Sequence, residues 1–470
     1  MTLHLHDTLT RRLRPVEPLE PGHVRIYTCG PTVWNRAHIG NFRTFLFEDV
    51  LRRWLDRRFD RVTHVMNLTD VDDRLIANAT AHGRSLEEET EPWIAAFIAD
   101  SDTLGIRAPQ VYPRATRHIP EMVALIGRLD EAGVTYRSED SIYFRIAGFP
   151  RYGALSGIRA EGLVAGASGR IDDDDYAKED ARDFALWKAV GSGDIGWDTA
   201  LGRGRPGWHI ECSAMSMALL GESFDIHCGG VDNIFPHHEN EIAQSEAATG
   251  KPFVRIWCHG EHLTISREKM AKRLGNFRTV PDLLAAGFRA SVIRYFLITG
   301  AHYRRSLDWD EAPLRAAEEA VDRLVEFRDR VRDLGAGEDG GELAERSDAA
   351  RAAFAEAMDD DLNVPAAVGQ VFAAIRDINR LLDAATPSAE VRLRLLDLVG
   401  EVDDVLGVLP LVDRERPDDG LSPEDQGLLD RRAAARTGRA WEEADRLRTR
   451  LLEHGIIVED TPQGQRWKRR

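Results

Sequence analysis

Residues 24–66 constrain the fold of this chain more than any other stretch. The run VRIYTC (24–29) alternates as a strand does, and the apolar residues at 47, 50, 51, 54 and 55 recur with helical spacing. A second strand-like run, RVTHVM, follows at 61–66. A strand, a helix and a strand in this order predict a parallel βαβ unit, which binds ligands at the carboxyl ends of its strands. Cys29 and Thr69 are expected at that edge.

Strand-like sequence returns after a loop-rich interval. Glycine, proline and aspartate are frequent between 115 and 200, and SFDIHCGG (223–230) and FVRIWCHG (253–260) then read as strands again. We therefore predict an α/β protein with a Rossmann-like parallel-sheet catalytic domain. Its two halves are expected at 1–114 and 201–300, split by a connective insertion at 115–200.

The sequence after the second half is helical in character. A Gly/Asp/Glu-rich stretch at 335–348 separates two amphipathic runs, and a Pro/Asp-rich break at 413–425 precedes a final β-like run. We predict a helical segment and linker at 301–345 and a helical bundle at 346–412. A linker and a small mixed unit are expected at 413–470.

The composition limits the classes of protein to consider. The 470 residues include 62 Lys and Arg and 79 Asp and Glu, which gives a net charge of −17. This charge argues against a protein that binds nucleic acid over its whole surface. No apolar run approaches the ~18 residues needed to cross a bilayer, and the N-terminus lacks the apolar core of a signal peptide. Four widely spaced cysteines do not make a disulfide framework. We expect reduced thiols and a cytoplasmic location.

Two short motifs suit phosphate chemistry. HIGN begins at a helix start, where backbone N–H groups favour an anion; Gly40 permits close approach and His38 could donate a hydrogen bond in a transition state. A helix cap or a surface histidine explains the same letters. REKMAKR (267–273) offers Lys269 and Lys272 to clamp a polyphosphate, although two loop lysines can also serve only solubility.

Two further motifs suit nucleoside and metal binding. HCGGVD (227–232) ends a strand with two glycines and an acid that could bind ribose hydroxyls, or it forms a tight turn. In PHHENE, His237 and Glu241 are four residues apart on one helix face, so an imidazole and a carboxylate could reach the same metal. An ion pair or a cap cluster fits that spacing equally well. Cys29 and Cys212 would complete a set of four ligands, but spacing alone does not bring them together.

The motifs taken together resemble those of class I aminoacyl-tRNA synthetases. HIGN looks like the first signature of that class and KMAKR resembles the second, KMSKS. The segments YTCGPTV, TDVDD, GRPGWHIECSAM, FDIHCGG and FPHHENEIAQS resemble the cysteinyl-tRNA synthetase family specifically. The likeness runs from near the N-terminus to the C-terminus.

The resemblance implies a role for each motif residue. The implied zinc ligands are Cys29, Cys212, His237 and Glu241. The implied ATP contacts are His38, Gly40, Asn41, Gly230, Asp232 and Lys272. The implied catalytic residues are His38, Lys269 and Lys272, and the residues that resemble an amino-acid pocket are Thr69 and Trp208.

The resemblance also implies a reaction and its partners. With one Zn²⁺ per chain and Mg²⁺ accompanying ATP, L-cysteine would be converted to cysteinyl-adenylate and transferred to the 3′ end of tRNA(Cys). Zinc would recognise the thiolate and so separate cysteine from serine without an editing site. Residues 301–345 would be a stem-contact segment and linker, 346–412 a helical tRNA-binding domain, and 413–470 a linker and a small anticodon-binding unit. No membrane is involved, and we expect a monomer.

Departures from the family pattern leave two rivals. Asn41 stands where the first signature often ends in histidine, and Ala271 and Arg273 replace two serines of the second. The loss of the serines bears on the rate of adenylation and is compatible with a specialised paralogue. One rival is a cysteine ligase of the mycothiol-pathway kind, which acylates an amino sugar; the anticodon-like C-terminal end favours tRNA instead. The other is a zinc-dependent binding protein, which has no need of a phosphate clamp.

Overall fold

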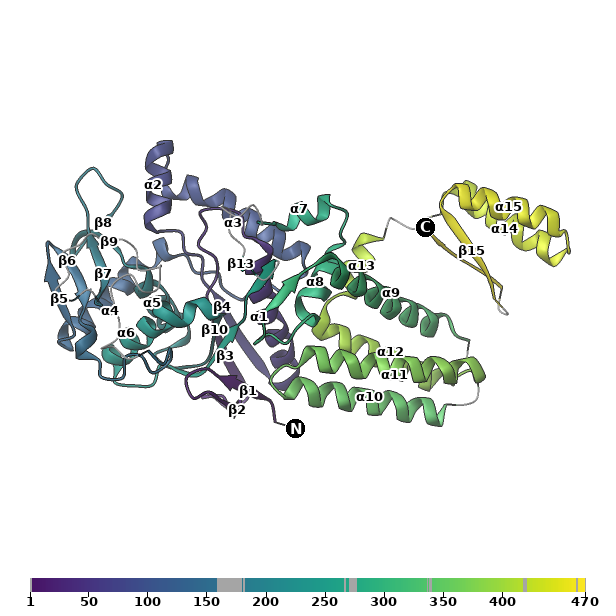
Figure 1. Cartoon of the computed structure of the whole chain (residues 1–470), viewed down its shortest axis with the longest axis horizontal. Coiled ribbons are helices and arrows are strands. Elements are labelled where there is room, and N and C mark those ends of the chain that lie inside the picture. Colours follow the sequence, from purple (N-terminus) through teal and green to yellow (C-terminus); the bar gives the residue numbers. More distant parts are fainter. Residues whose placement is uncertain are drawn as a thin grey trace. The chain divides into compact units, whose positions relative to one another are not determined.

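The computed structural model describes most of the chain in two compact units, Met1–Leu411 and Val412–Arg470 (Figure 1). The described residues are 2–158, 180, 182–265, 268–269, 277–335, 337, 340–416, 421–461 and 464–469. The second signature therefore lies outside them, apart from the backbone at 268–269.

A four-stranded parallel sheet lies at the centre of the first unit, in the order β11-β10-β3-β4. Its strands are β3 (His23–Thr28), β4 (Arg61–Met66), β10 (Phe224–Gly230) and β11 (Val254–Gly260). The helix α1 (Ile39–Arg58) connects β3 to β4, and α6 (Glu239–Thr249) lies between β10 and β11 in the chain. The predicted βαβ unit and the Rossmann-like α/β class are confirmed.

The two central strands come from distant parts of the chain. β3 and β10 are parallel neighbours, with Thr28 opposite Cys228, and their residues are almost all buried. The chain leaves β3 toward β4 on one side and leaves β10 toward β11 on the other. Strand order therefore reverses between β3 and β10, and a crevice is expected beyond their carboxyl ends.

A buried charge cluster joins α1 to the helix α8 (Ala290–Thr299). Asp49 Oδ2 accepts hydrogen bonds from Arg294 at 2.6 Å and from Arg53 at 2.7 Å. Arg294 also donates to the backbone carbonyls of Leu104 and Leu406. Because these guanidinium and carboxylate groups are out of water, each needs the other as a partner.

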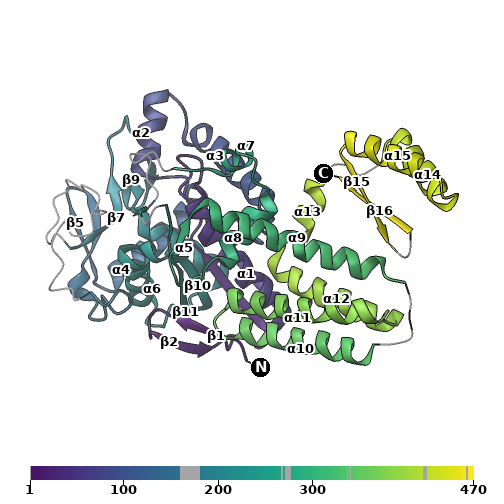
Figure 2. The same ribbon diagram turned by 45° about the vertical axis from the view of Figure 1, so that its right-hand side comes forward.

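The segment inserted between the two halves contains a five-stranded antiparallel sheet (Figure 2). Its order is β5-β6-β7-β9-β8, formed by Thr135–Ser138, Ser141–Phe144, Phe184–Ala189, Gly202–Pro206 and Trp197–Thr199. The helix α4 (Ile119–Glu131) precedes it, and α5 (Trp208–Leu220) leads from it back to β10.

Smaller elements surround the parallel sheet. A hairpin is formed by β1 (His4–Asp7) and β2 (Arg12–Pro15), and a second small sheet by β12 (Leu263–Ile265), β13 (Glu268–Lys269) and β14 (Leu307–Trp309). The helices α2 (Asp73–His82), α3 (Leu86–Thr103) and α7 (Val280–Ala285) complete this part.

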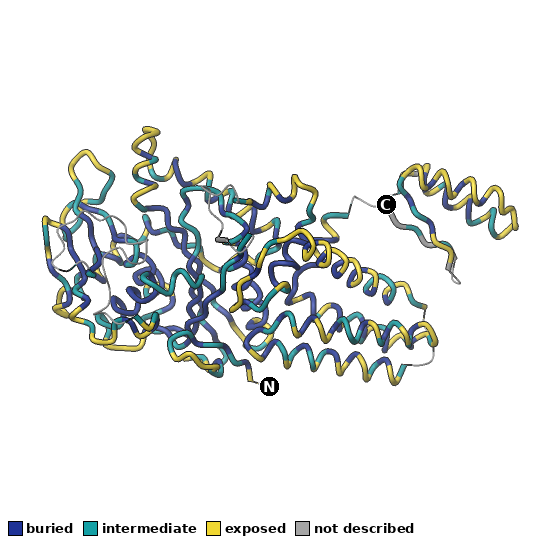
Figure 3. The backbone as a smooth tube through the Cα atoms, viewed as in Figure 1, coloured by how far each residue is buried: buried dark blue, intermediate teal, exposed yellow. Residues whose placement is uncertain are grey.

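Helices follow the parallel-sheet part of the first unit. They are α9 (Glu311–Asp333), α10 (Gly341–Asp359), α11 (Val364–Ala384), α12 (Ala389–Leu406) and α13 (Leu409–Glu415). The tube in Figure 3 alternates between buried and exposed along α9 to α12, as helical apolar spacing requires when one face packs inward. Across the described ranges of the chain, no helix has the length and apolar character to cross a membrane.

The second unit has its own hydrophobic core. Its elements are α14 (Pro423–Thr437), α15 (Trp441–Glu453), β15 (Ile456–Thr461) and β16 (Gly464–Arg469). This core is formed by Leu428, Leu429, Leu447, Leu451, Ile456 and Val458.

Candidate active site

A pocket of ≈ 330 Å³ opens beyond the carboxyl ends of β3 and β10, at the reversal of strand order. Residues from the helix starts of α1 and α5 and from the loops after β3, β4 and β10 line it. The sequence-predicted residues on its wall are Cys29, His38, Gly40, Asn41, Thr69, Trp208, Cys212, Gly230, Asp232 and His237. Glu241 lies behind this wall and is fully buried.

Two glycines in the pocket wall allow neighbouring groups to approach the backbone closely. A Cβ at Gly30 would lie 1.8 Å from the Asn67 carbonyl oxygen, and one at Gly230 would lie 2.5 Å from Asp232 Oδ1. Both distances are far below van der Waals contact. Any larger residue would therefore push Asn67 away from the loop after β3, or displace the Asp232 carboxylate at the end of β10.

Four side chains at the inner end of the pocket bring possible metal ligands together. Cys29 follows β3, Cys212 lies on α5, His237 lies in the turn Ile234–His238, and Glu241 lies on α6. One donor atom from each lies within 4.8 Å of the other three. The atoms His237 Nε2 and Glu241 Oε1 are 3.1 Å apart, yet Oε1 forms no hydrogen bond among the described residues.

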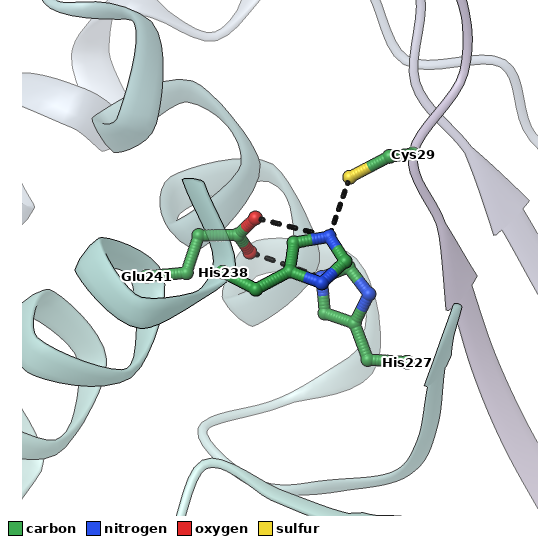
Figure 4. Close-up of side chains that lie close together, drawn as sticks. All are labelled: Cys29, His227, His238 and Glu241. Atoms are coloured by element: carbon green, nitrogen blue, oxygen red, sulfur yellow. Dashed lines mark hydrogen bonds and ion pairs between the residues drawn. The ribbon is translucent and has the colours of Figure 1, made fainter. Parts of the chain in front are cut away.

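A second set of donors shares Cys29 and Glu241 with the first. His227 Nε2 lies 3.0 Å from Glu241 Oε2, and His238 Nε2 lies 3.3 Å from Cys29 Sγ (Figure 4). Because Cys29 and Glu241 belong to both sets, the sets describe alternative positions for one ion. Cys212 and His237 line the pocket, whereas His227 and His238 do not. Only the set with Cys212 therefore faces the pocket.

Without an ion, two of these four groups hold a proton and two are anionic. Burial and the hydrogen bond that the Cys29 thiol donates to Cys212 raise the pKa of Cys29 well above its usual range. The same hydrogen bond, aided by His237, lowers the pKa of Cys212 to about 6. Burial opposes charge on His237, but Cys212 and Glu241 raise its pKa to about 10. Burial likewise opposes charge on Glu241, but His227 and His237 lower its pKa to about 2.

The HIGN motif forms the first turn of α1. His38 is the N-cap: its Nδ1 accepts a hydrogen bond from the Asn41 amide at 3.2 Å, and Asn41 Oδ1 accepts one from the His38 amide at 3.1 Å. The capping interpretation of the histidine is therefore correct, and it does not exclude phosphate binding. Since Nδ1 is an acceptor, the neutral ring carries its hydrogen on Nε2. Gly40 and Asn41 line the pocket beside it.

The segment that carries the two lysines begins and ends at this pocket. Before it, Leu263 of β12 lines the pocket. After it, the Phe277 ring lies 5.2 Å from the His38 ring, and the Arg278 carbonyl accepts a hydrogen bond from the Ile39 amide. The backbone of Lys269 pairs with Thr264 in the small sheet. Lys272 lies outside the described residues.

Sequence reasoning missed several residues around the site. His209 Nδ1 lies 3.0 Å from His237 Nδ1, and His238 Nδ1 lies 2.8 Å from His259 Nε2. These histidines, like His227, stand inside motifs that the sequence singles out. The sequence feature that could have identified them is the recurrence of histidine at strand ends and helix starts. Nothing in their spacing says which imidazole faces the pocket.

Family models match almost the whole chain. Residues 15–319 match the "tRNA synthetases class I (C) catalytic domain", residues 353–410 match the "DALR domain", and residues 418–467 match the "Cysteinyl-tRNA ligase anticodon binding domain". The matched ranges follow the chain in the order of the sheet, the helices and the second unit.

Curated relatives match at full length. A cysteine–tRNA ligase of Protochlamydia amoebophila is 44% identical over 471 residues, which are 99% of this chain and 98% of that protein. The cysteine–tRNA ligase of Solibacter usitatus is 45% identical over 472 residues, covering 100% of both. That of Chlamydia pneumoniae is 46% identical over 475 residues, or 99% of this chain and 98% of the relative.

A solved structure shares the fold at low identity. A methionyl-tRNA synthetase of Mycobacterium tuberculosis in complex with methionyl-adenylate superposes with a TM-score of 0.60 and 15% identity, covering 86% of this chain and 95% of that one. That likeness shows the fold alone, whereas the full-length relatives and the matched family models show which family the chain belongs to. The chain belongs to the cysteine–tRNA ligase family of class I aminoacyl-tRNA synthetases.

Proposed function

We propose that this chain activates L-cysteine with ATP and transfers it to the 3′ end of tRNA(Cys). The observation that carries the proposal is one pocket with two chemically different walls. Buried thiol, imidazole and carboxylate donors form one wall, and the first turn of α1 with the flanks of the lysine segment forms the other. Such a pocket can hold a thiol and a nucleotide phosphate at the same time.

The donor set suits zinc. Two sulfurs, an imidazole nitrogen and a carboxylate oxygen are typical zinc ligands, and Glu241 Oε1 is a buried acceptor without a hydrogen-bond donor in the described structure. His227 holds the other oxygen, Oε2, so the orientation of the carboxylate is set from behind. We therefore assign Cys29, Cys212, His237 and Glu241 as the residues that would hold Zn²⁺.

Such an ion would supply a soft Lewis acid for the substrate thiolate, which a serine hydroxyl matches poorly. Shape alone separates these two amino acids only modestly, because they are nearly isosteric. The residues beside the donor set define the rest of the pocket. Trp208 stacks on His237 with ring centroids 4.4 Å apart, and Thr69 adds a hydroxyl to the wall.

The chain's own residues would orient the adenylation step. The substrate carboxylate attacks the α-phosphate of ATP, and pyrophosphate leaves. His38 would donate from Nε2 to a phosphate oxygen, next to the anion-favouring start of α1 at Gly40 and Asn41. Lys269 and Lys272 would neutralise the charge on the leaving group with Mg²⁺, and Gly230 and Asp232 would bind the ribose.

The tRNA would then be bound by the later parts of the chain. The second unit, with its own core, supports tRNA as the acceptor, because its sequence matches an anticodon-binding model. A charging assay with total tRNA and radiolabelled cysteine tests this, with a parallel reaction that offers an amino sugar instead. We expect cysteine on tRNA(Cys) and none on the sugar. Acylation of the sugar alone would support the mycothiol-pathway rival, and cysteine binding without ATP–pyrophosphate exchange would support a binding protein.

A further inference from the structure

Three consecutive aspartates at the turn from α10 to α11 have different surroundings. Asp359 and Asp361 are buried, whereas Asp360 is exposed. The Asp359 carboxylate accepts hydrogen bonds from the side chains of Trp54 and Arg58 on α1. The helical bundle is thus attached to the parallel-sheet part by a buried carboxylate at this turn, and Asp361 offers a second one.

The backbone of the same turn is strained. Asp361 and Leu362 have φ angles of 58° and 52°, in the left-handed region that residues with a Cβ rarely adopt. Such a conformation persists only where the surrounding contacts hold it, and it is often found at functional sites. The contacts that hold Asp361 are therefore expected to serve more than the bundle itself.

Asp361 joins two distant segments of the chain to the turn. Its Oδ1 accepts hydrogen bonds from the His6 amide of β1 at 2.8 Å and from the Tyr303 hydroxyl at 2.6 Å. Its Oδ2 accepts one from the Arg304 guanidinium at 2.6 Å, and its carbonyl accepts one from His302 Nε2 at 2.9 Å. Three of these four donors belong to the loop after α8, so Asp361 fixes the position of that loop.

Tyr303 connects this loop to the wall of the pocket. Its ring stacks on the Phe47 ring of α1, with centroids 4.2 Å apart and planes 6° apart. Its carbonyl accepts a hydrogen bond from the Glu261 amide at 2.8 Å. The next two residues, His262 and Leu263, line the pocket on the side that leads into the lysine segment. Tyr303 therefore holds the backbone directly before the pocket wall.

The end of the same loop supports that wall at a second point. The Leu307 amide donates to the His262 carbonyl at 3.1 Å, and the Ser306 hydroxyl donates to the same carbonyl at 3.3 Å. Leu307 begins β14, which pairs with β12 from Leu263 onward. The position of the loop thus determines where the backbone of residues 261–263 lies.

We propose that Asp361 is a positioning residue for the nucleotide wall of the pocket, acting through Tyr303 on the backbone that carries Leu263. This inference rests on the proposed function, and it adds a contact by which the helical bundle sets the geometry of ATP binding. Without the Asp361 carboxylate, the Tyr303 hydroxyl loses its acceptor and the loop is free to shift. The proposed zinc ligands lie on other elements and should not respond.

The test measures the binding of ATP and of cysteine separately. The variants are Asp361→Ala, which removes the acceptor, and Tyr303→Phe, which removes the hydroxyl and keeps the stacked ring. Asp360→Asn is the exposed control on the same turn. Asp359→Asn is the buried control, because it weakens an attachment to α1 instead of one to the loop. The readouts are the two KM values in ATP–pyrophosphate exchange, bound zinc, and hydrogen exchange at the Glu261 amide.

We expect Asp361→Ala to raise the KM for ATP about tenfold, the size of a lost hydrogen bond to a charged group. Tyr303→Phe should raise it about threefold, and combining it with Asp361→Ala should add no further increase, because both act on the same bond. Hydrogen exchange at the Glu261 amide should become faster in both variants. The KM for cysteine should stay within about twofold and the zinc content should not change, and the two control variants should leave the KM for ATP within about twofold.

An equal rise in the KM for cysteine and the KM for ATP would overturn the inference, because it would indicate a general loss of structure. A rise in the KM for ATP of the same size in Asp359→Asn would overturn it for the same reason. If Asp361→Ala does not fold, Tyr303→Phe decides: a raised KM for ATP alone supports the proposal, and an unchanged KM for ATP contradicts it.

The same measurements separate this inference from the proposed function. An unmodified enzyme without cysteine-dependent exchange would overturn the proposed function and the inference together. An active enzyme in which neither Asp361→Ala nor Tyr303→Phe changes the KM for ATP would overturn only the inference.

Discussion

His237 Nε2 lies 3.1 Å from Glu241 Oε1 without forming a hydrogen bond to it. Both atoms belong to the set of four donors that could hold one ion once the imidazole has lost its proton. Without an ion, the His237 imidazole holds a proton, because Cys212 and Glu241 raise its pKa to about 10. Metal binding must therefore displace that proton.

Zinc binding to the chelator-treated protein should release about two protons at pH 7.5. One comes from the Cys29 thiol, whose pKa is raised well above its usual range, and one comes from His237. Cys212 contributes almost none, since its pKa of about 6 makes it a thiolate at this pH. Calorimetry in buffers of different ionisation enthalpy measures the number. Release of no protons would contradict the ligand assignment.

Substitution of a ligand should weaken cysteine binding far more than ATP binding. We expect Cys212→Ser and His237→Ala to lose zinc and to raise the KM for cysteine by at least tenfold, about 1.4 kcal/mol or more. The KM for ATP should change little, because the proposed nucleotide site lies at the opposite wall. Metal analysis and pyrophosphate exchange check this. Retained zinc with unchanged cysteine binding in both variants would show the site to be elsewhere.

Lys272→Ala should slow adenylation with little change in the affinity for cysteine. Its role is a prediction from the second signature, since the residue lies outside the described part of the chain. Lys251→Ala is a matched control, because Lys251 is exposed and pairs with Glu222 on the surface. Single-turnover formation of the adenylate, with cysteine binding measured separately, gives both quantities. Equal losses in rate and affinity would contradict a role confined to ATP.

The fold could be predicted where the decisive pattern is local. The strand, helix and strand of residues 24–66 are confirmed because apolar spacing over a few turns is enough to specify them. The convergence of Cys29 with Cys212 could not be predicted from spacing. It depends on β3 pairing with β10 across nearly two hundred residues, which local sequence does not encode. Similarly, only the turn Ile234–His238 decides that His237 faces the pocket and His238 does not.

Asp49→Asn should destabilise the first unit by about 3–5 kcal/mol, because it leaves the buried Arg294 guanidinium without its charge partner. Denaturant unfolding measures the change. Asp56→Asn on the same helix is the control: Asp56 pairs with Arg52 and Arg107 at a partly exposed position, so its loss should cost less than about 1 kcal/mol. Similar losses in the two variants would mean that burial of the pair does not matter.

The same cluster predicts an acid dependence. Burial would raise the pKa of Asp49, but Arg294 and Arg53 lower it below its usual value. Its stabilising contribution is therefore complete above an unfolded-state pKa of about 3.9 and is lost as the pH falls through the lower folded-state value. Unfolding free energies between pH 5 and pH 2 should fall less steeply in Asp49→Asn than in the unmodified protein. Identical slopes would contradict this assignment.

Trp441→Ala should impair tRNA charging without affecting adenylation. The Trp441 side chain is 55% exposed at the start of α15, and the Arg436 guanidinium lies 5.6 Å from its ring. An exposed ring beside a cation suits stacking on a nucleotide base. We expect a KM for tRNA raised about tenfold and unchanged pyrophosphate exchange. Leu452→Ala, another exposed apolar residue of α15, is the control, and equal effects of both changes would argue against stacking.

The most direct measurement replaces zinc with Co²⁺ and follows the sulfur-to-cobalt charge-transfer absorption as amino acids are added. If the bound metal reads the substrate sulfur, cysteine will increase this absorption by one thiolate ligand and serine will leave it unchanged. A spectrum that does not respond to cysteine, from protein that still forms the adenylate, would contradict selection of the substrate by its thiolate.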